Sequence, residues 1–322
     1  MRALEIGFGW LLDLLLGDPE PHPVSGLGRI IAWADARLPR TRSAGALLVL
    51  VVAGGTWALS WGLVALAARA DPLLGALASG ILFFAATALR TLDREARATA
   101  SALAAGDLDA ARRRVGRLVG RDTGGLDEAG LARAAVEAVA ESSVDAVTAP
   151  LLFAALGGGP LAMAYRAVNT MDSMVGHRDE RYRRFGWAAA RLDDVLNWVP
   201  ARATGLLLVL AAGLVGEDAR GAWRILARDR LRHDSPNAGH PEAAVAGALG
   251  LRLGGPASYG GERVVKPWLG DGGGEAGAVH VLRAMRLVHV AALMALGMAM
   301  AGTFSWDPLP RYATMICMED MP

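Results

Sequence analysis

The chain has 322 residues, of which 53% are hydrophobic and 20% are charged, and its mean hydropathy of +0.31 is high for a soluble protein. A formal net charge of +1 excludes a basic field for nucleic acid and an acidic tail. Cys317 is the only cysteine, which excludes an intramolecular disulfide framework and a multi-cysteine metal site. These bounds favour an integral membrane protein.

The first apolar run, residues 6–16, does not have the pattern of a cleavable signal peptide. It contains Asp13 and lacks a basic leader and a small-residue cleavage site. The three prolines of the following "GDPEPHP" forbid a helix, so we expect the next helix to begin near Val24. Asp18 and His22 lie on this turn. They belong either to a simple loop or to a site for an anion or a metal ion.

Two uncharged segments then follow in close succession. Residues 43–68 and residues 72–89 carry no charged side chain, and only three residues separate them. A helix needs about 20 apolar residues to cross the hydrocarbon core. One such run alone has a buried core helix as its alternative, but two in succession predict a helical hairpin through a bilayer. We expect a third span at residues 287–306, with Trp306 as an interfacial anchor.

Two further apolar runs are weaker candidates. Residues 146–165 are interrupted by Pro150 and by "GGGP", and residues 203–216 are short for a span. If both runs crossed the membrane, the arginines would be divided between its two sides, against the positive-inside rule. We therefore expect one or both runs to be re-entrant. The polar segments that carry most of the arginines are residues 90–145, 166–202 and 217–286.

These patterns predict an all-α integral membrane protein. We expect a single polytopic domain over residues 1–322, built as a multi-pass helical bundle whose helical cytoplasmic loops carry the candidate active site. Within the loops, residues 107–119 and residues 126–148 have the pattern of amphipathic helices, and we expect the second to end at Pro150.

Three carboxylates at helical spacing lie in the second of these helices. Glu137, Glu141 and Asp145 follow one another at intervals of four residues, which places them on one face of a helix. Like charges on one face repel one another unless positive charge lies among them, and either a Mg²⁺ ion or arginine side chains can supply it. The simpler alternative is a solvated face on which Arg133 pairs with Glu137.

Residues 165–198 form a polar segment between apolar neighbours. Asn and Asp side chains at helical spacing suit a metal ion, a ribose or an amide ligand, and the aromatic residues between them suit a flat organic group. An interfacial helix pair with ordinary salt bridges is the alternative. The polar side chains of this segment are Asn169, Asp172 and Ser173 in a first cluster, and Arg191, Asp193, Asp194 and Asn197 in a second.

Residues 232–250 and the glycine-rich stretch after them add turn formers and two histidines. No third His or Cys follows at an interval usual for zinc. The stretch "LGGPASYGGERVVKPWLG" lacks the pattern of a P-loop, and a bare glycine pair is more often a turn than a phosphate cradle. The side chains of interest here are His233, Asp234, Ser235, Asn237, His240, Tyr259 and Lys266.

Taken together and in this order, these stretches resemble the adenosylcobinamide-phosphate synthase family, the cobalamin-biosynthesis membrane proteins known as CbiB or CobD. The resemblance covers most of residues 13–270. In one departure, the chain has "EAVAES" where the family usually has "ESxAEN", so Ser142 stands in place of an Asn. The matching motifs are "GDPEPHPVSGLGRII", "GRDTGGLDEAGLARAAVEAVAESSVDAVTAPLLFAALGGGP", "YRAVNTMDSMVGHRDERYRRFGWAAARLDDVLNWVPAR" and "HDSPNAGHPEAAVAGALGLRLGG".

The resemblance implies an amide-forming step late in corrinoid assembly. The family joins (R)-1-amino-2-propanol or its O-phosphate to the free propionate of (adenosyl)cobyric acid, which gives (adenosyl)cobinamide or its phosphate. Because a carboxylate and an amine do not condense spontaneously in water, we expect coupling to ATP hydrolysis with Mg²⁺. The cobalt belongs to the corrinoid substrate and not to the protein. The resemblance also implies a cytoplasmic-membrane location and other cobalamin-biosynthesis enzymes as partners.

Roles for individual residues follow as hypotheses. Phosphate charge needs a metal ion and cations, and the attacking amine must lose a proton. The expected metal ligands are Glu137, Glu141 and Asp145. The expected catalytic residues are Asp172, Arg191, Asp193 and Asp194. The expected substrate-binding residues are Arg121, Arg166, Asn169, Asn197, His233, Ser235, Asn237 and Tyr259.

Two other classes of protein remain as alternatives. A transporter places ionisable residues within its membrane spans, whereas residues 43–68 and 72–89 have none. A non-catalytic scaffold for corrinoid enzymes does not require so many Asn, Asp and Arg residues within short motifs.

Overall fold

The computed structural model describes residues 1–17, 24–177 and 179–305. The interpretation of Asp18 and His22 lies outside these ranges. Helices dominate the described residues and confirm the expected all-α multi-pass membrane protein. The helices of the first half are α1 (Arg2–Leu16), α2 (Val24–Arg37), α3 (Arg42–Ala70), α4 (Pro72–Ala86), α5 (Leu89–Ala104), α6 (Leu108–Leu118) and α7 (Glu128–Ser143).

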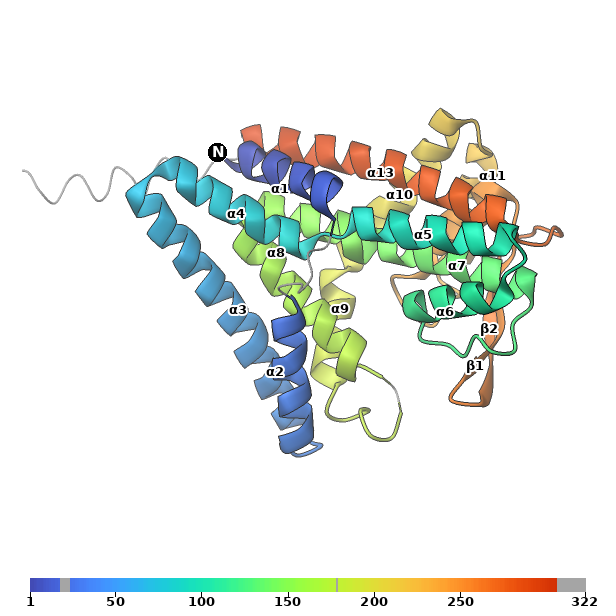
Figure 1. The fold of residues 1–322 in the computed structure, drawn as a ribbon, viewed down its shortest axis with the longest axis horizontal. Helices are drawn as coiled ribbons and strands as arrows, with labels where there is room; N and C mark the ends of the chain where they lie inside the picture. The colour runs from blue at the N-terminus through green and yellow to red at the C-terminus, as the bar shows by residue number, and fades with distance from the viewer. Residues whose placement is uncertain (18–23, 178, 306–322) are drawn as a thin grey trace, which may run out of the picture.

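The second half begins with a π-helical turn and contains one small sheet. Its elements are η1 (Val144–Thr148), α8 (Ala149–Val175), α9 (Trp187–Leu196), α10 (Trp198–Val215), α11 (Ala219–Asp229), α12 (Gly239–Leu249), β1 (Leu253–Tyr259), β2 (Glu262–Leu269) and α13 (Ala278–Ser305). In Figure 1, α1, α4, α5, α7 and α13 run roughly parallel along the long axis of the molecule, and α3 diverges from them.

Five helical runs in the described residues are long and apolar enough to cross a membrane. They include the expected hairpin and both of the weaker candidates, and they are Arg42–Ala70, Pro72–Ala104, Glu128–Val175, Trp198–Val215 and Ala278–Thr303. Helix α10 has 18 residues and is therefore about 27 Å long, slightly less than the hydrocarbon core of about 30 Å. Helix α8 bends where Gly158 takes a φ of 73° just before Pro160, at the predicted interruption.

Helix α3 is the least buried of the five candidate membrane spans. Only 17% of its apolar window is buried, and large side chains such as Leu50 and Leu59 are exposed. An apolar helix of this length with so little protein around it needs lipid as its solvent. Asp71 ends α3 and caps α4, because its Oδ1 accepts hydrogen bonds from the backbone N–H groups of Leu73 (2.6 Å) and Leu74.

A buried polar contact joins α1, α4 and α8 between their apolar faces. The Ser79 hydroxyl donates to Glu5 Oε2 at 2.7 Å and accepts from the backbone N–H of Gly159 at 2.8 Å. Glycines permit this approach, since a Cβ on Gly9 would overlap the carbonyl oxygen of Gly80. The three helices therefore pack at backbone distance.

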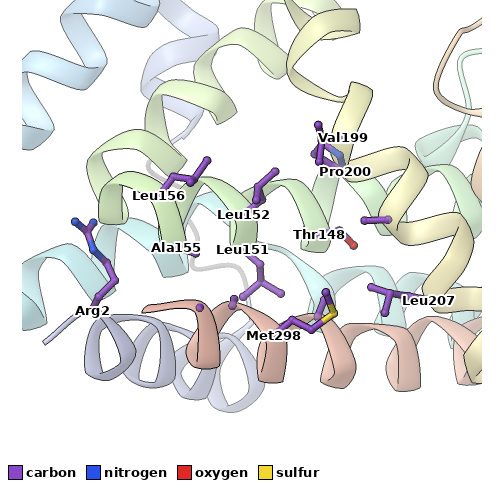
Figure 2. A pocket seen from close by; sticks show the side chains of 14 residues that line it. Arg2, Thr148, Leu151, Leu152, Ala155, Leu156, Val199, Pro200, Leu207 and Met298 are labelled. Carbon is purple, nitrogen blue, oxygen red and sulfur yellow. The ribbon is translucent and has the colours of Figure 1, made fainter. Parts of the chain in front are cut away.

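An apolar cavity of about 560 Å³ lies between α1, η1, α8, α10 and α13 (Figure 2). Leucine side chains from α8 and α10 and Met298 from α13 line it, with Arg2 at one end. Thr148 places η1 in its wall, so the π-helical turn faces both this apolar space and the polar site described below.

Two expectations about the loops are wrong. The helix over residues 126–148 does not end at Pro150, because Pro150 occupies the first turn of α8, where its missing N–H is tolerated. The segment 217–286 is not wholly helical, because β1 and β2 form an antiparallel hairpin. Its turn consists of Gly260 and Gly261 with φ of 57° and 85°, a geometry that glycine adopts without strain. By contrast, the predicted starts of α2 at Val24 and of α6 are confirmed.

The packing of α3 on the chain before α9 gives a stability test. A Cβ on Gly45 would overlap the carbonyl oxygen of Phe185, whereas a Cβ on Gly54 of the same helix would meet nothing within 4 Å. We expect Gly45→Ala to lower the free energy of unfolding by about 1–3 kcal/mol through overpacking. Gly54→Ala should leave it unchanged or raise it by about 0.5–1 kcal/mol. Thermal unfolding in detergent measures both, and equal melting temperatures would contradict this packing.

Candidate active site

Five carboxylates line one cavity of about 220 Å³, which we call the carboxylate cavity. No Arg, Lys or His among the described residues lines it. The remaining polar lining consists of Asn and Ser side chains, so the cavity presents mostly oxygen atoms. Its polar residues are Glu141 from α7, Asp145 from η1, Asp172 from α8, Asp193 and Asp194 from α9, Asn197, and Ser235 and Asn237 from the loop before α12.

The π-helical turn η1 positions Asp145. Two residues outside η1 form hydrogen bonds with its backbone. Ala146 O accepts one from the Thr87 hydroxyl at 2.8 Å and one from the Ala88 N–H at 3.0 Å. Thr87 and Ala88 form the joint between α4 and α5, which thus supports η1. Single π turns within α-helices occur often at functional sites, because they change the direction of a side chain without ending the helix.

Amide side chains hold Asp193 in place. Asn169 Nδ2 donates to its Oδ1 at 3.3 Å, and Asn197 Nδ2 donates to its Oδ2 at 3.0 Å. The buried Tyr165 hydroxyl lies 2.9 Å from Asn197 Oδ1 and 3.3 Å from Asp145 Oδ1. This network connects η1, α8, α9 and the start of α10 through hydrogen bonds to two carboxylates, Asp145 and Asp193.

Burial, together with the nearby charges of Asp145 and Asp172, raises the pKa of Asp193 to about 8. The hydrogen bonds from Asn197 and Asn169 oppose the shift. A carboxyl group with a pKa near 8 gains and loses its proton near neutral pH, which is the range that general acid–base catalysis requires.

The loop before α12 is fixed to α9. Asn237 Nδ2 donates to the backbone oxygen of Asp194 at 2.8 Å, and Arg202 donates to Asn237 Oδ1 at 3.3 Å. The Ser235 N–H donates to His233 Nδ1 at 2.9 Å. His233 therefore holds the backbone of this loop through Ser235. Burial lowers the pKa of the His233 imidazole.

A second buried group lies where α7 meets β1. The Arg121 guanidinium forms an ion pair with one oxygen of Glu137, and the other oxygen accepts the Gly254 N–H at 2.7 Å. An arginine side chain thus neutralises the charge of Glu137, which is one of the two alternatives that the sequence left open. Arg133 does not pair with Glu137 but lies 5.2 Å from the ring centre of Trp268.

Glu242 on α12 joins this group and was not expected from the sequence. Its side chain is buried, and burial together with the charges of Glu137 and Glu141 raises its pKa well above the ordinary value. His233 Nε2 lies 3.7 Å from Glu242 Oε1. The only available signal was a carboxylate within the apolar run of "HPEAAVAGALG".

The other sequence-predicted residues lie around these two groups. Arg166 on α8 donates to Asn169 Oδ1 at 3.4 Å, and Arg191 lies 3.8 Å from Asp194. Tyr259 lies on β1, with the Lys266 ammonium 5.4 Å from its ring centre. His240 is buried but does not line the carboxylate cavity, and burial beside two arginines lowers its pKa to about 4.

The donor set suits Mg²⁺ only in part. No group of three or more His, Cys, Asp or Glu side chains in the described ranges is arranged to hold a metal ion. Mg²⁺ at nucleotide sites is usually held by one or two carboxylates, with phosphate and water oxygens completing its shell. Glu141 and Asp145 fit that pattern, since both line the carboxylate cavity, whereas Glu137 forms an ion pair with Arg121.

Comparisons with known proteins match nearly the whole chain. The family model described as CobD/Cbib protein matches residues 6–288. Cobalamin biosynthesis protein CobD of Klebsiella pneumoniae is 49% identical over 307 residues, 92% of this chain and 96% of that relative. The relative of the same name from Geobacter metallireducens is 52% identical over 267 residues, which are 81% of this chain and 84% of that relative. Cobalamin biosynthesis protein CbiB of Salmonella typhimurium is 45% identical over 310 residues, covering 94% and 97%. No solved structure shows a significant match.

Asp193 gives a test based on pH. Its pKa in the folded protein, about 8, is raised above the ordinary 3.8, so the folded state retains a proton that the unfolded state has lost between these values. Stability should therefore fall as pH rises from about 4 to 8. We expect Asp193→Asn to flatten this dependence and to raise the melting temperature at pH 8.

The matched control is Asp109→Asn, which removes an exposed carboxylate from α6. It should keep the wild-type slope of melting temperature against pH, measured in detergent from pH 5 to 9. A wild-type slope in Asp193→Asn would show that Asp193 does not hold the proton.

Proposed function

Since this chain belongs to the CobD/CbiB family, we propose that it acts in cobalamin biosynthesis, as an ATP-dependent ligase. In the proposed reaction, the free propionate of (adenosyl)cobyric acid forms an amide with (R)-1-amino-2-propanol or its O-phosphate. One observation carries the proposal beyond the family: α7, η1, α8, α9 and the loop before α12 together build one cavity lined with carboxylates and amides.

The amine substrate reaches the site as an ammonium ion and must lose a proton before its nitrogen can attack. Asp193 suits this role because its pKa of about 8 lies closer to that of an amine than an ordinary carboxylate's does. Asn169 and Asn197 hold both of its oxygens, so the proton acceptor has a fixed orientation. Asp172 and Asp194 in the same cavity attract the ammonium ion.

The carboxyl partner and the phosphates are anions and need cations. Arg191 lies beside Asp194 of the carboxylate cavity, and Arg166 lies beside Asn169, which binds Asp193. Arg121 lies beside Glu137. Mg²⁺, held by Glu141 and Asp145, would neutralise phosphate charge during activation of the carboxylate. The amides of Asn197 and Asn237 can donate to and accept from the amide rim of a corrin.

We propose the cytoplasmic membrane as the location, with the carboxylate cavity on the cytoplasmic side. Five apolar helical runs support membrane insertion, and the arginine-rich segments that carry the site favour the cytoplasmic face. ATP is available on that face. Other enzymes of the pathway that supply the corrinoid and consume the product are the expected partners.

An assay of the detergent-purified chain tests the proposal. The protein receives adenosylcobyric acid, ATP and Mg²⁺, with aminopropanol or its O-phosphate in parallel, and corrinoid products are identified by mass. We expect a product that has gained the amine with loss of water, and no product without ATP. Folded protein that forms no amide with either amine would contradict the ligase and favour the scaffold alternative.

The carboxylates have a matched control on the same helix. We expect Glu141→Gln and Asp145→Asn each to lower kcat/KM by about 100-fold or more and to raise the Mg²⁺ concentration for half-maximal rate. Glu128→Gln removes an exposed carboxylate at the start of α7 and should retain the wild-type rate. Unchanged kinetics in Glu141→Gln and Asp145→Asn would remove both residues from the site.

A further inference from the structure

The space of about 560 Å³ between α8, α10 and α13, which we call the apolar cavity, lies on the other side of η1 from the carboxylate cavity. Among the described residues that line it, only Arg2 and Thr148 have polar side chains. Figure 2 shows these two well apart, with leucine side chains of α8 between them. The proposed ligase reaction does not use this space.

The apolar cavity opens at the surface of three candidate membrane spans. Leu156 of α8, Val199 of α10 and Met298 of α13 line it, and they are 53%, 52% and 63% exposed. A residue that lines a cavity and is also this exposed lies at the rim of the cavity. All three belong to helical runs long and apolar enough to cross a membrane, so the rim borders the hydrocarbon of the bilayer.

Neither water nor empty space suits the apolar cavity in a membrane. A buried water molecule needs two to four polar partners, and the Thr148 hydroxyl already donates to the backbone oxygen of Ser143 at 3.3 Å. An empty cavity deprives the side chains of its lining of dispersion contacts. The occupant is therefore apolar.

The size of the apolar cavity selects an acyl chain over a protein segment. An α-helix is about 10–12 Å wide with its side chains, so a cavity of about 560 Å³ admits roughly one turn of a partner helix. The acyl chains that border the rim are narrow and flexible, and they are present at high concentration wherever the helices span a membrane.

Arg2 gives the apolar cavity one charged end. Its side chain is 16% exposed, and it lies 4.0 Å from Glu5 Oε2, an oxygen that already accepts the Ser79 hydroxyl. Within the part of the chain that the structure describes, the Arg2 guanidinium donates no hydrogen bond. Planar guanidinium groups bind phosphate oxygens in a bidentate manner, so this end of the cavity suits an anionic phosphate group.

Arg2 also lies toward a boundary of the membrane. Helices α1 and α4 run side by side in the same direction, because Glu5 binds Ser79 and the next turn of α1 packs with Gly9 on the backbone of Phe84. Arg2 precedes Glu5 by about one turn and is therefore nearer to the polar joint between α3 and α4. That joint connects two spans, so it lies where lipid headgroups begin.

We propose that the apolar cavity binds one phospholipid of the bilayer, with an acyl chain along α8 between α10 and α13 and with the phosphate at Arg2. Binding of the lipid does not depend on the proposed ligase function. Thr148 of η1 lies in the wall of the apolar cavity, and Asp145 of the same turn lines the carboxylate cavity. The acyl chain therefore packs against the turn that positions Asp145. A second step, which rests on the proposed function, is that amide formation depends on this lipid.

Two glycines of α13 give a matched pair of variants. A Cβ on Gly302 or on Gly297 would meet nothing within 4 Å, but of the two only Gly302 lines the apolar cavity. Full-length protein is purified from membranes in a mild detergent, and native mass spectrometry counts the phospholipids that each chain retains. We expect one retained phospholipid in the wild type and in Gly297→Phe. Occupancy should fall about 10-fold in Gly302→Phe, where the added ring takes the place of the chain.

A titration tests the position of the phosphate. Delipidated full-length protein in detergent receives phosphatidylglycerol, and the rise in melting temperature reports binding to the folded state. Arg2→Gln should need about 10-fold more lipid for the same rise. Arg69→Gln, which removes an exposed arginine at the end of α3, should behave as the wild type. Glycerol phosphate, which has the charged group without the chains, should give no rise.

Retention of detergent alone by the wild type, or equal retention of lipid by Gly302→Phe and Gly297→Phe, would overturn the lipid site. Equal titrations of Arg2→Gln and Arg69→Gln would overturn the position of the phosphate. The product assay separates these failures from that of the ligase. Retained lipid without any amide product would reject the ligase and leave the lipid site standing. Amide formation at the wild-type rate by Gly302→Phe that has lost its lipid would reject the effect on η1. Melting temperatures check that each variant is folded.

Discussion

The rest of this structure depends on one constraint, which is that several carboxylates are buried beside apolar helices. An unpaired buried charge is too costly to persist, so each one needs a partner or a proton. Glu137 obtains Arg121 and the Gly254 N–H, which ties α7 to the β-hairpin. Asp193 obtains two amide donors and a raised pKa. We propose that a positively charged substrate group binds among the five carboxylates that line the cavity.

The membrane helices were largely predictable from the sequence, because an uncharged run of span length has few other stable uses. The absence of charge predicted the pair of helices α3 and α4. Proline and glycine predicted the start of α2 and the bend before Pro160. The β1–β2 hairpin was missed although its Gly260–Gly261 turn is a usual hairpin signal. In a chain so rich in helix, the two short strands were overlooked.

The site was predictable as a set of residues and less so as a geometry. Spacing placed Glu137, Glu141 and Asp145 on one helical face, but the π-helical turn that carries Asp145 leaves no mark in the spacing. Nor does spacing show that Glu137 is bound by Arg121 while Glu141 lines the cavity. Such assignments depend on which helix packs beside which, and tertiary contacts decide that. Glu242 was missed for the same reason, since only its neighbours make its burial significant.

The measurement that tests the central claim most directly is an experimental structure of the full-length chain with (R)-1-amino-2-propanol or its O-phosphate bound, in the presence of Mg²⁺. We predict the amine nitrogen within hydrogen-bonding distance of Asp193 or its neighbouring carboxylates. Amine density at another place in the molecule, with the carboxylate cavity filled only by water, would contradict the account.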